Sequence, residues 1–181
     1  MLPTDELVKE YNAIKVMLGV MDNISNRLES SEKVEPKHLE QIVKFLQVFA
    51  DKCHHGKEED LLFPAMIEAG VPSEGGPIAV ILDEHKMGRN YIKKMSNAIA
   101  DYRKGTGSAE IVENARGYIP LLTQHINKED NVLYPMANQW LSEQKQKELL
   151  EGFEDVEHNI IGEGRHEEFH KLLHSLKEEY P

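Results

Sequence analysis

The chain has 181 residues, one cysteine and a formal net charge of −11. Its length predicts one domain over residues 1–181, and its acidic excess disfavours nucleic acid and anionic membranes as partners. A lone cysteine excludes an internal disulfide, no apolar run is long enough to cross a membrane, and no signal peptide is evident, so we expect a cytoplasmic protein.

Helical periodicity runs through the chain, and no stretch alternates as a strand would. The apolar stripes predict helices over about 4–29 and 36–70, then from Pro77 to about 103, and from Ser108 to about 140. Their connections are short to moderate, which favours antiparallel neighbours. We therefore predict an all-α fold, an up-down-up-down four-helix bundle over about 4–140. A C-terminal helical appendage over about 142–180 should follow it, with an interruption at Gly162 and Gly164.

An eleven-residue motif occurs twice in the chain. Residues 54–64 read HHGKEEDLLFP and residues 125–135 read HINKEDNVLYP, with five identical positions. Each copy places a histidine four residues before a glutamate, which puts both side chains on one face of a helix. The pairs are His54 with Glu58 and His125 with Glu129.

The repeat extends toward the N-terminus of each half. Glu84 and His85 precede the second motif by about the distance at which Glu10 and Tyr11 precede the first. Each half therefore supplies a glutamate, then an aromatic residue, and later a His-x-x-x-Glu pair. Tyr11 takes the place at which the other half carries His85.

Imidazoles together with carboxylates suit iron, zinc or manganese, whereas calcium and magnesium prefer ligand sets made only of oxygen. Two facing halves would supply two carboxylates that can each bridge two cations, with imidazoles in the outer positions. A single zinc ion needs only four ligands and would leave groups unused. We predict a carboxylate-bridged pair of iron ions, for which zinc or manganese is a weaker fit. The predicted ligands are His54, Glu58, His85, His125 and Glu129.

The residues beside these ligands are predicted to have lesser roles. His55, whose counterpart is Ile126, is expected behind the ligands or at the surface, with metal ligation as a further possibility. Lys57 and Lys128 are expected at the surface, and Cys53 is expected to pack in the core.

At these residues the chain resembles the hemerythrin-like HHE cation-binding family. The matching pieces are Glu84-His85, His54-x-x-x-Glu58 with its Leu-Phe-Pro, and His125-x-x-x-Glu129 with its Leu-Tyr-Pro. The resemblance implies a four-helix bundle around an oxo- or hydroxo-bridged di-iron centre. It also implies a small ligand, such as dioxygen, nitric oxide or peroxide. Family members bind oxygen, sense oxygen or iron, consume peroxide or nitric oxide, or repair iron–sulfur centres.

One position departs from the family pattern, because Tyr11 stands where a first-helix histidine is normal. Three outcomes follow: Tyr11 ligates as a phenolate, one iron keeps an open position, or a histidine of the appendage fills the gap. For the last outcome His158 is the best candidate, with Glu163 and His166 behind it.

Three functions compete at this stage. The first is a carrier, scavenger or sensor that binds a small ligand at a di-iron centre. The second is a di-iron oxidoreductase acting on peroxide or nitric oxide, or a protein of iron storage or iron-centre repair. The third is a helical bundle without a metal. The sequence identifies neither a redox partner nor an oligomeric state.

Overall fold

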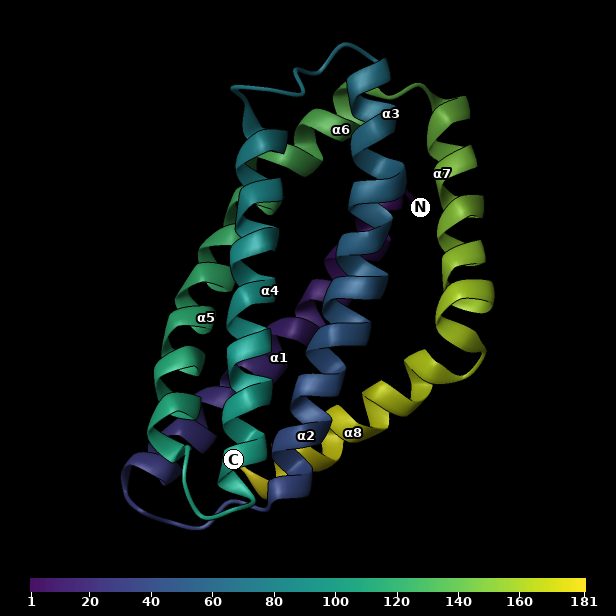
Figure 1. The fold of residues 1–181 in the computed structure, drawn as a ribbon. Coiled ribbons are helices and arrows are strands. Elements are labelled where there is room, and N and C mark those ends of the chain that lie inside the picture. The colour runs from purple at the N-terminus through teal and green to yellow at the C-terminus, as the bar shows by residue number, and fades with distance from the viewer.

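The structure is a computed structural model that describes residues 1–181 and contains helices but no strand. Four helical rods form its body (Figure 1). The first is α1 (Pro3–Glu29) and the third is α4 (Pro77–Tyr102). The second joins α2 (Pro36–Phe45), the π-helical segments η1 (Leu46–His55) and η2 (Glu58–Leu62), and α3 (Phe63–Glu68). The fourth joins α5 (Ser108–Lys128), the π-helical η3 (Glu129–Leu133) and α6 (Tyr134–Trp140).

The rods form a closed ring of neighbours. α1 packs against α5, α5 against α4, α4 against α2 and η1, and η1 against α1. Consecutive rods run in opposite directions (Figure 1), so the predicted all-α up-down-up-down bundle is confirmed. Its interior is one continuous apolar core, in which side chains such as Leu7, Met17, Phe45 and Ile78 are fully or almost fully buried.

The rods begin and end where residues with special backbone preferences stand. Pro36 and Pro77 are the first helical residues of α2 and α4, where the missing amide hydrogen costs nothing. Ser108 is the first residue of α5, and Gly107 precedes it with φ of 88°. A side chain at Gly107 would lie 2.5 Å from the carbonyl oxygen of Ala98, so close packing of α4 against this turn requires glycine.

The predicted C-terminal appendage consists of α7 (Glu143–Asp155), the π-helical η4 (Val156–Gly162) and α8 (Arg165–Glu179). Ser142 caps α7 by accepting a hydrogen bond from the amide of Lys145. Gly162 and Gly164 both have positive φ and turn the chain between η4 and α8. α7 and α8 both pack on α1, and α8 also reaches α2 (Figure 1).

The end of the chain is anchored to the bundle. Tyr180 is buried, and its hydroxyl lies 2.6 Å from Nδ1 of His38 on α2. Asn23 of α1 donates a hydrogen bond to the Tyr180 carbonyl oxygen. No helix combines the length and the apolar character that crossing a membrane requires.

Candidate metal centre

The buried polar residues gather where the rods become π-helical. Glu58 and Glu129 are the first residues of η2 and η3, and His54 and His55 are the last two of η1. A π-helical turn is wider than an α-helical turn and occurs often at functional sites. Here the wider turns direct adjacent polar side chains into the bundle, and Glu58 and Glu129 have no exposed surface at all.

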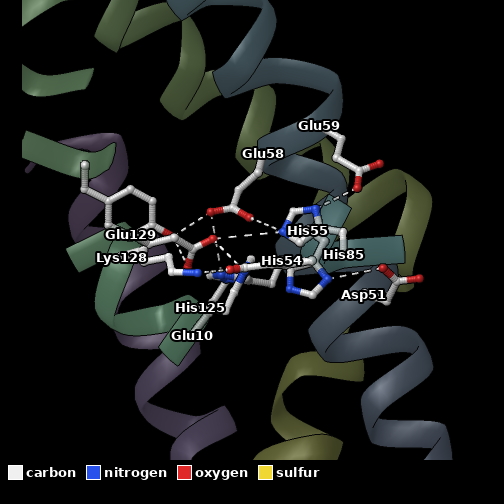
Figure 2. Close-up of polar contacts among 12 residues, drawn as sticks. Glu10, Asp51, His54, His55, Glu58, Glu59, His85, His125, Lys128 and Glu129 are labelled. Atoms are coloured by element: carbon white, nitrogen blue, oxygen red, sulfur yellow. Dashed lines mark hydrogen bonds and ion pairs between the residues drawn. The ribbon is translucent and has the colours of Figure 1, made fainter. Parts of the chain in front are cut away.

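The two carboxylates lie at the middle of the cluster and point toward one another, with imidazoles around them (Figure 2). Nε2 of His125 lies 2.9 Å from Oε1 of Glu129, and Nε2 of His85 lies 3.3 Å from Oε2 of Glu58. Nε2 of His54 lies 3.9 Å from Oε1 of Glu58. All three imidazoles therefore present the same ring nitrogen to the carboxylates.

The donor atoms form two groups, each compact enough to hold one cation. One group contains His54, Glu58 and Glu129, and the other contains His55, Glu58, His85 and His125. Within each group the donor atoms lie within 4.8 Å of one another. Glu58 belongs to both groups, and Glu129 of the first group also contacts His125 of the second. The arrangement suits a pair of cations that share carboxylates.

Several of these atoms are buried and make no hydrogen bond of good geometry, although some lie 2.9–3.3 Å from one another. They are Nε2 of His54, His85 and His125, Oε2 of Glu58 and Oε1 of Glu129. A buried polar atom left unpaired costs free energy on the order of 1–3 kcal/mol. Five such atoms that face one another are the expected signature of a site whose bound ion supplies the missing partner. The donor set of imidazoles and carboxylates therefore fits a metal.

Each imidazole has a carboxylate next to its other ring nitrogen, Nδ1. Nδ1 of His54 lies 2.9 Å from Glu10, and Nδ1 of His85 lies 2.7 Å from Glu59. Nδ1 of His55 lies 3.2 Å from Asp51, and Nδ1 of His125 lies 3.4 Å from Glu84. An ionised carboxylate can only accept, so Nδ1 of His54, His55 and His85 carries the hydrogen and Nε2 of each faces the cluster. Nδ1 of His125 approaches Glu84 without making a hydrogen bond. Such carboxylates commonly orient the histidine ligands of metals.

The charges of the cluster also favour a cation. Burial raises the pKa of Glu129, and the neighbouring Glu58 raises it further. Burial opposes ionisation of Glu58 as well, but the imidazoles of His54 and His85 outweigh burial and lower this pKa to about 2. Burial disfavours a proton on His125, yet Glu129 outweighs it and raises the pKa to about 10. Without a metal, protons on the imidazoles balance the buried carboxylates, and a divalent ion would supply the same balance.

Comparison with known proteins agrees with this geometry. The family model for the hemerythrin HHE cation-binding domain matches residues 2–137. The chain belongs to the hemerythrin HHE family. Three uncharacterized mycobacterial proteins, one from Mycobacterium bovis and two from Mycobacterium tuberculosis, are each 23% identical to it over 162 residues. The match covers 88% of this chain but only 62% of each relative. No solved structure matches.

The hemerythrin match ends before α7, so the appendage lies outside it. The five predicted ligands His54, Glu58, His85, His125 and Glu129 all lie within the matched residues and within one buried cluster. Their roles as metal ligands remain a prediction.

The structure excludes the surface position for His55 and leaves its role at the ligands a prediction. His55 is 5% exposed and stacks on His85 with ring centroids 3.8 Å apart. Burial and the nearby His85 and His125 lower its pKa well below the usual value, which keeps the imidazole neutral and able to bind a metal. Sequence reasoning favoured a lesser role for His55, because in an α-helix the adjacent His54 takes the inward position.

Lys57 was expected at the surface, and this expectation was wrong. Its side chain is fully buried and forms ion pairs with Glu10 and with Glu157 of η4. The appendage covers it, which no pattern within the motif could reveal. Its counterpart Lys128 pairs with Glu84 and remains 49% exposed.

Tyr11 lies beside the first group, as its place in the repeat predicts. It is 1% exposed, its ring meets that of His54 edge-on at 6.4 Å, and it stacks on Tyr134 at 6.0 Å. Burial, and then Asp130 and Glu129, raise its pKa. The phenol is therefore kept protonated in the metal-free protein.

The appendage brings no histidine into the cluster. His158 is 56% exposed, and its only ion pair is with Glu154 on the same helical stretch. Glu163 is exposed in the turn between η4 and α8. His166 points inward but stops at Cys53 and Glu10, on the far side of the Glu10–His54 pair. The position opposite Tyr11 is thus not filled from the appendage.

Tyr134 is a residue of the site that the sequence did not single out. Its buried hydroxyl lies 2.6 Å from Oε1 of Glu58 and 3.4 Å from Oε2 of Glu129, so it touches both central carboxylates. Its counterpart in the first motif is Phe63, which has no hydroxyl. The Tyr–Phe difference between otherwise similar motifs was the available signal.

Proposed function

We propose that this protein binds two iron ions between its two halves and takes up dioxygen, nitric oxide or peroxide at the half that contains Tyr11. The observation that carries the proposal is the set of buried, unpartnered Nε2 and carboxylate oxygen atoms that face one another. His54, Glu58 and Glu129 would hold one ion. His55, His85 and His125, together with Glu58, would hold the other.

The two groups differ in a way that favours one of them for an exogenous ligand. The group of His55, His85 and His125 has three imidazoles, whereas His54 is the only imidazole of the first group. Tyr11 lies at the first group, but its pKa is raised, which disfavours the phenolate form that would ligate. An ion held by fewer protein ligands keeps positions for a small molecule, and we assign the small-ligand position to the side of Tyr11.

When bound, iron at such a site supplies reversible coordination of small ligands and exchange of electrons with them. The chain's own residues do the rest. Glu10 orients His54 through Nδ1, Glu84 lies 3.4 Å from Nδ1 of His125, and the apolar core excludes water. The Tyr134 hydroxyl donates to Glu58 and fixes the rotamer of that carboxylate.

The direct test is anaerobic reconstitution with Fe²⁺ followed by metal analysis. We expect two iron ions per chain and a visible absorption change when dioxygen, nitric oxide or peroxide is added. Tyr11→Phe should leave the iron content and the visible spectrum unchanged. Tyr91→Phe, which alters a partly buried tyrosine elsewhere on the bundle, is the matched control. A charge-transfer band that disappears only in Tyr11→Phe would show instead that the phenolate is a ligand.

A second function is favoured by one observation, the contact of the Tyr134 hydroxyl with both central carboxylates. A proton donor at this place suits an oxidoreductase that consumes peroxide or nitric oxide. Stopped-flow mixing of the reduced protein with each molecule separates the two functions. A stable adduct supports binding. Repeated turnover in the presence of a reductant, slowed in Tyr134→Phe, supports catalysis.

A further inference from the structure

A second cluster of metal-ligating side chains lies where the appendage meets the bundle. It contains Glu10 of α1, Cys53 of η1 and His166 of α8, whose donor atoms lie within 4.8 Å of one another. Glu157 of η4 reaches the same place, with its Oε1 4.0 Å from Nε2 of His166. The cluster stands apart from the proposed iron centre and shares with it only Glu10.

The distances between the donor atoms match those around a small tetrahedral ion. Sγ of Cys53 lies 3.2 Å from Nε2 of His166 and 3.9 Å from Oε1 of Glu10, and that oxygen lies 4.0 Å from Nε2 of His166. Bonds of about 2.0–2.3 Å to a tetrahedral zinc ion place its ligand atoms roughly 3.3–3.8 Å apart. Cys53, His166 and Glu10 are therefore close to the positions needed for one ion, and Glu157 would complete the set once the Lys57 ammonium moves away.

The two oxygens of Glu10 serve different partners. Oε2 faces His54, while Oε1 faces Lys57, Cys53 and His166. The carboxylate can therefore orient His54 and bind an ion on its other side at the same time.

Lys57 shows that this place already attracts a positive charge. Its ammonium contacts Oε1 of Glu10 and Oε1 of Glu157, the same two oxygens that would bind the ion. One ammonium against two carboxylates leaves a negative charge uncompensated. A divalent ion in place of the ammonium would balance both carboxylates, and the thiol proton of Cys53 would leave to solvent as the sulfur binds.

The cluster also opens to solvent. Glu10, Glu157 and His166 line a groove of about 760 Å³ between α1 and the appendage. The rest of its lining includes three further glutamates and two histidines, but also Lys9 and Lys147. A cation can therefore reach the cluster without passing through the bundle.

We propose that Glu10, Cys53, His166 and Glu157 form a second metal site, for one zinc-like divalent ion, that fastens the appendage to the bundle. Thiolate, imidazole and carboxylate together are the ligand set of zinc, and of cobalt as its spectroscopic substitute. Two ligands come from the bundle and two from the appendage, so the bound ion cross-links the two parts. The second half of the repeat cannot build such a site, because Gln124 stands in the place of Cys53.

The test uses the full-length Glu58→Gln variant, in which the proposed iron centre is disabled, titrated with Co²⁺ alone. We expect one cobalt ion per chain with thiolate-to-cobalt absorption in the near ultraviolet. Cys53→Ser added to this variant should remove that absorption, and His166→Ala should weaken binding by about tenfold or more. His158→Ala is the matched control, because His158 lines the same groove but lies outside the cluster, and it should change nothing.

Lys57→Met removes the competing ammonium and should tighten cobalt binding. X-ray absorption at the zinc edge of wild-type protein that is first loaded with two iron ions and then given one equivalent of zinc should detect a sulfur ligand, and it does not depend on any variant folding. The proposal is overturned if cobalt gives no thiolate absorption in either Glu58→Gln or Glu58→Gln/Lys57→Met, or if the zinc shows no sulfur neighbour. Iron loading of the wild type is measured separately, so this outcome leaves the proposed di-iron function untouched.

Discussion

The two halves of the repeat place corresponding residues in corresponding contacts, but they differ in what covers them. In the first half Glu10 holds His54 and pairs with Lys57, and in the second Glu84 holds His125 and pairs with Lys128. The appendage buries Lys57 completely, whereas Lys128 is half exposed. The comparison teaches that the internal repeat determines how the imidazoles are oriented. A segment outside the repeat determines how far solvent is excluded from each half.

The largest effect on iron binding is expected at Glu58, which lies between the two halves. Glu58→Gln removes a carboxylate that belongs to both donor groups, so we expect loss of both iron ions, a decrease in affinity of more than about 100-fold. Asp60→Asn, an exposed residue of the same turn, is the control and should load normally. Metal analysis after anaerobic loading provides the measurement. Retention of two ions by Glu58→Gln would show that the halves bind their ions independently.

The two lysines should differ strongly in their contribution to stability. Lys57→Met leaves Glu10 and Glu157 without their buried cation, and such a loss costs about 3–5 kcal/mol. Lys128→Met removes a half-exposed pair, worth about 0–1 kcal/mol. Urea unfolding in the presence of a chelator measures both. Equal losses would mean that the appendage does not change the environment of the first half.

Substitution of Glu10 or Glu84, the carboxylates next to Nδ1 of His54 and His125, should change metal affinity by smaller and unequal amounts. Glu10→Gln and Glu84→Gln weaken the partner of one ligand each, and such changes commonly cost about 10–100-fold in metal affinity. We expect the larger effect at Glu10, because it lies 2.9 Å from His54 whereas Glu84 lies 3.4 Å from His125. Competition with a chelator of known affinity measures each variant, and Glu74→Gln in an exposed loop is the control.

A further effect is expected on the pH dependence of stability. The pKa of His125 rises from about 6.5 to about 10 on folding, so its pair with Glu129 stabilises the metal-free protein below about pH 6.5 and is lost as the pH rises toward 10. The metal-loaded protein has no such proton to lose. Thermal unfolding across this range should decline for the metal-free protein more steeply than for the loaded one. Parallel curves would contradict a metal ligated by His125.

Much of this architecture could be predicted from the sequence. Periodicity and turn residues were sufficient for the four rods and the appendage, because each rod buries one apolar stripe. The His-x-x-x-Glu spacing was sufficient to place His54, Glu58, His125 and Glu129 on inward faces, since their pairs recur in both halves.

The parts that could not be predicted depend on departures from α-helical geometry or on distant segments. The π-helical turns bring His55 beside His85, although an α-helix would direct the neighbour of His54 elsewhere. The burial of Lys57 requires Glu157, which lies 100 residues further along the chain. A pattern read within one motif contains neither piece of information.

The anchoring of Tyr180 on α1 and α2 has a practical consequence for anyone who handles this protein. A tag or fusion at the C-terminus would disturb the contacts of Tyr180, which hold α8 against the bundle. α8 contains His166, which lies beside Glu10. A displacement of the last residues would therefore shift His166, and through Glu10 it would change the orientation of His54. Tags are better placed at Met1, which is 75% exposed.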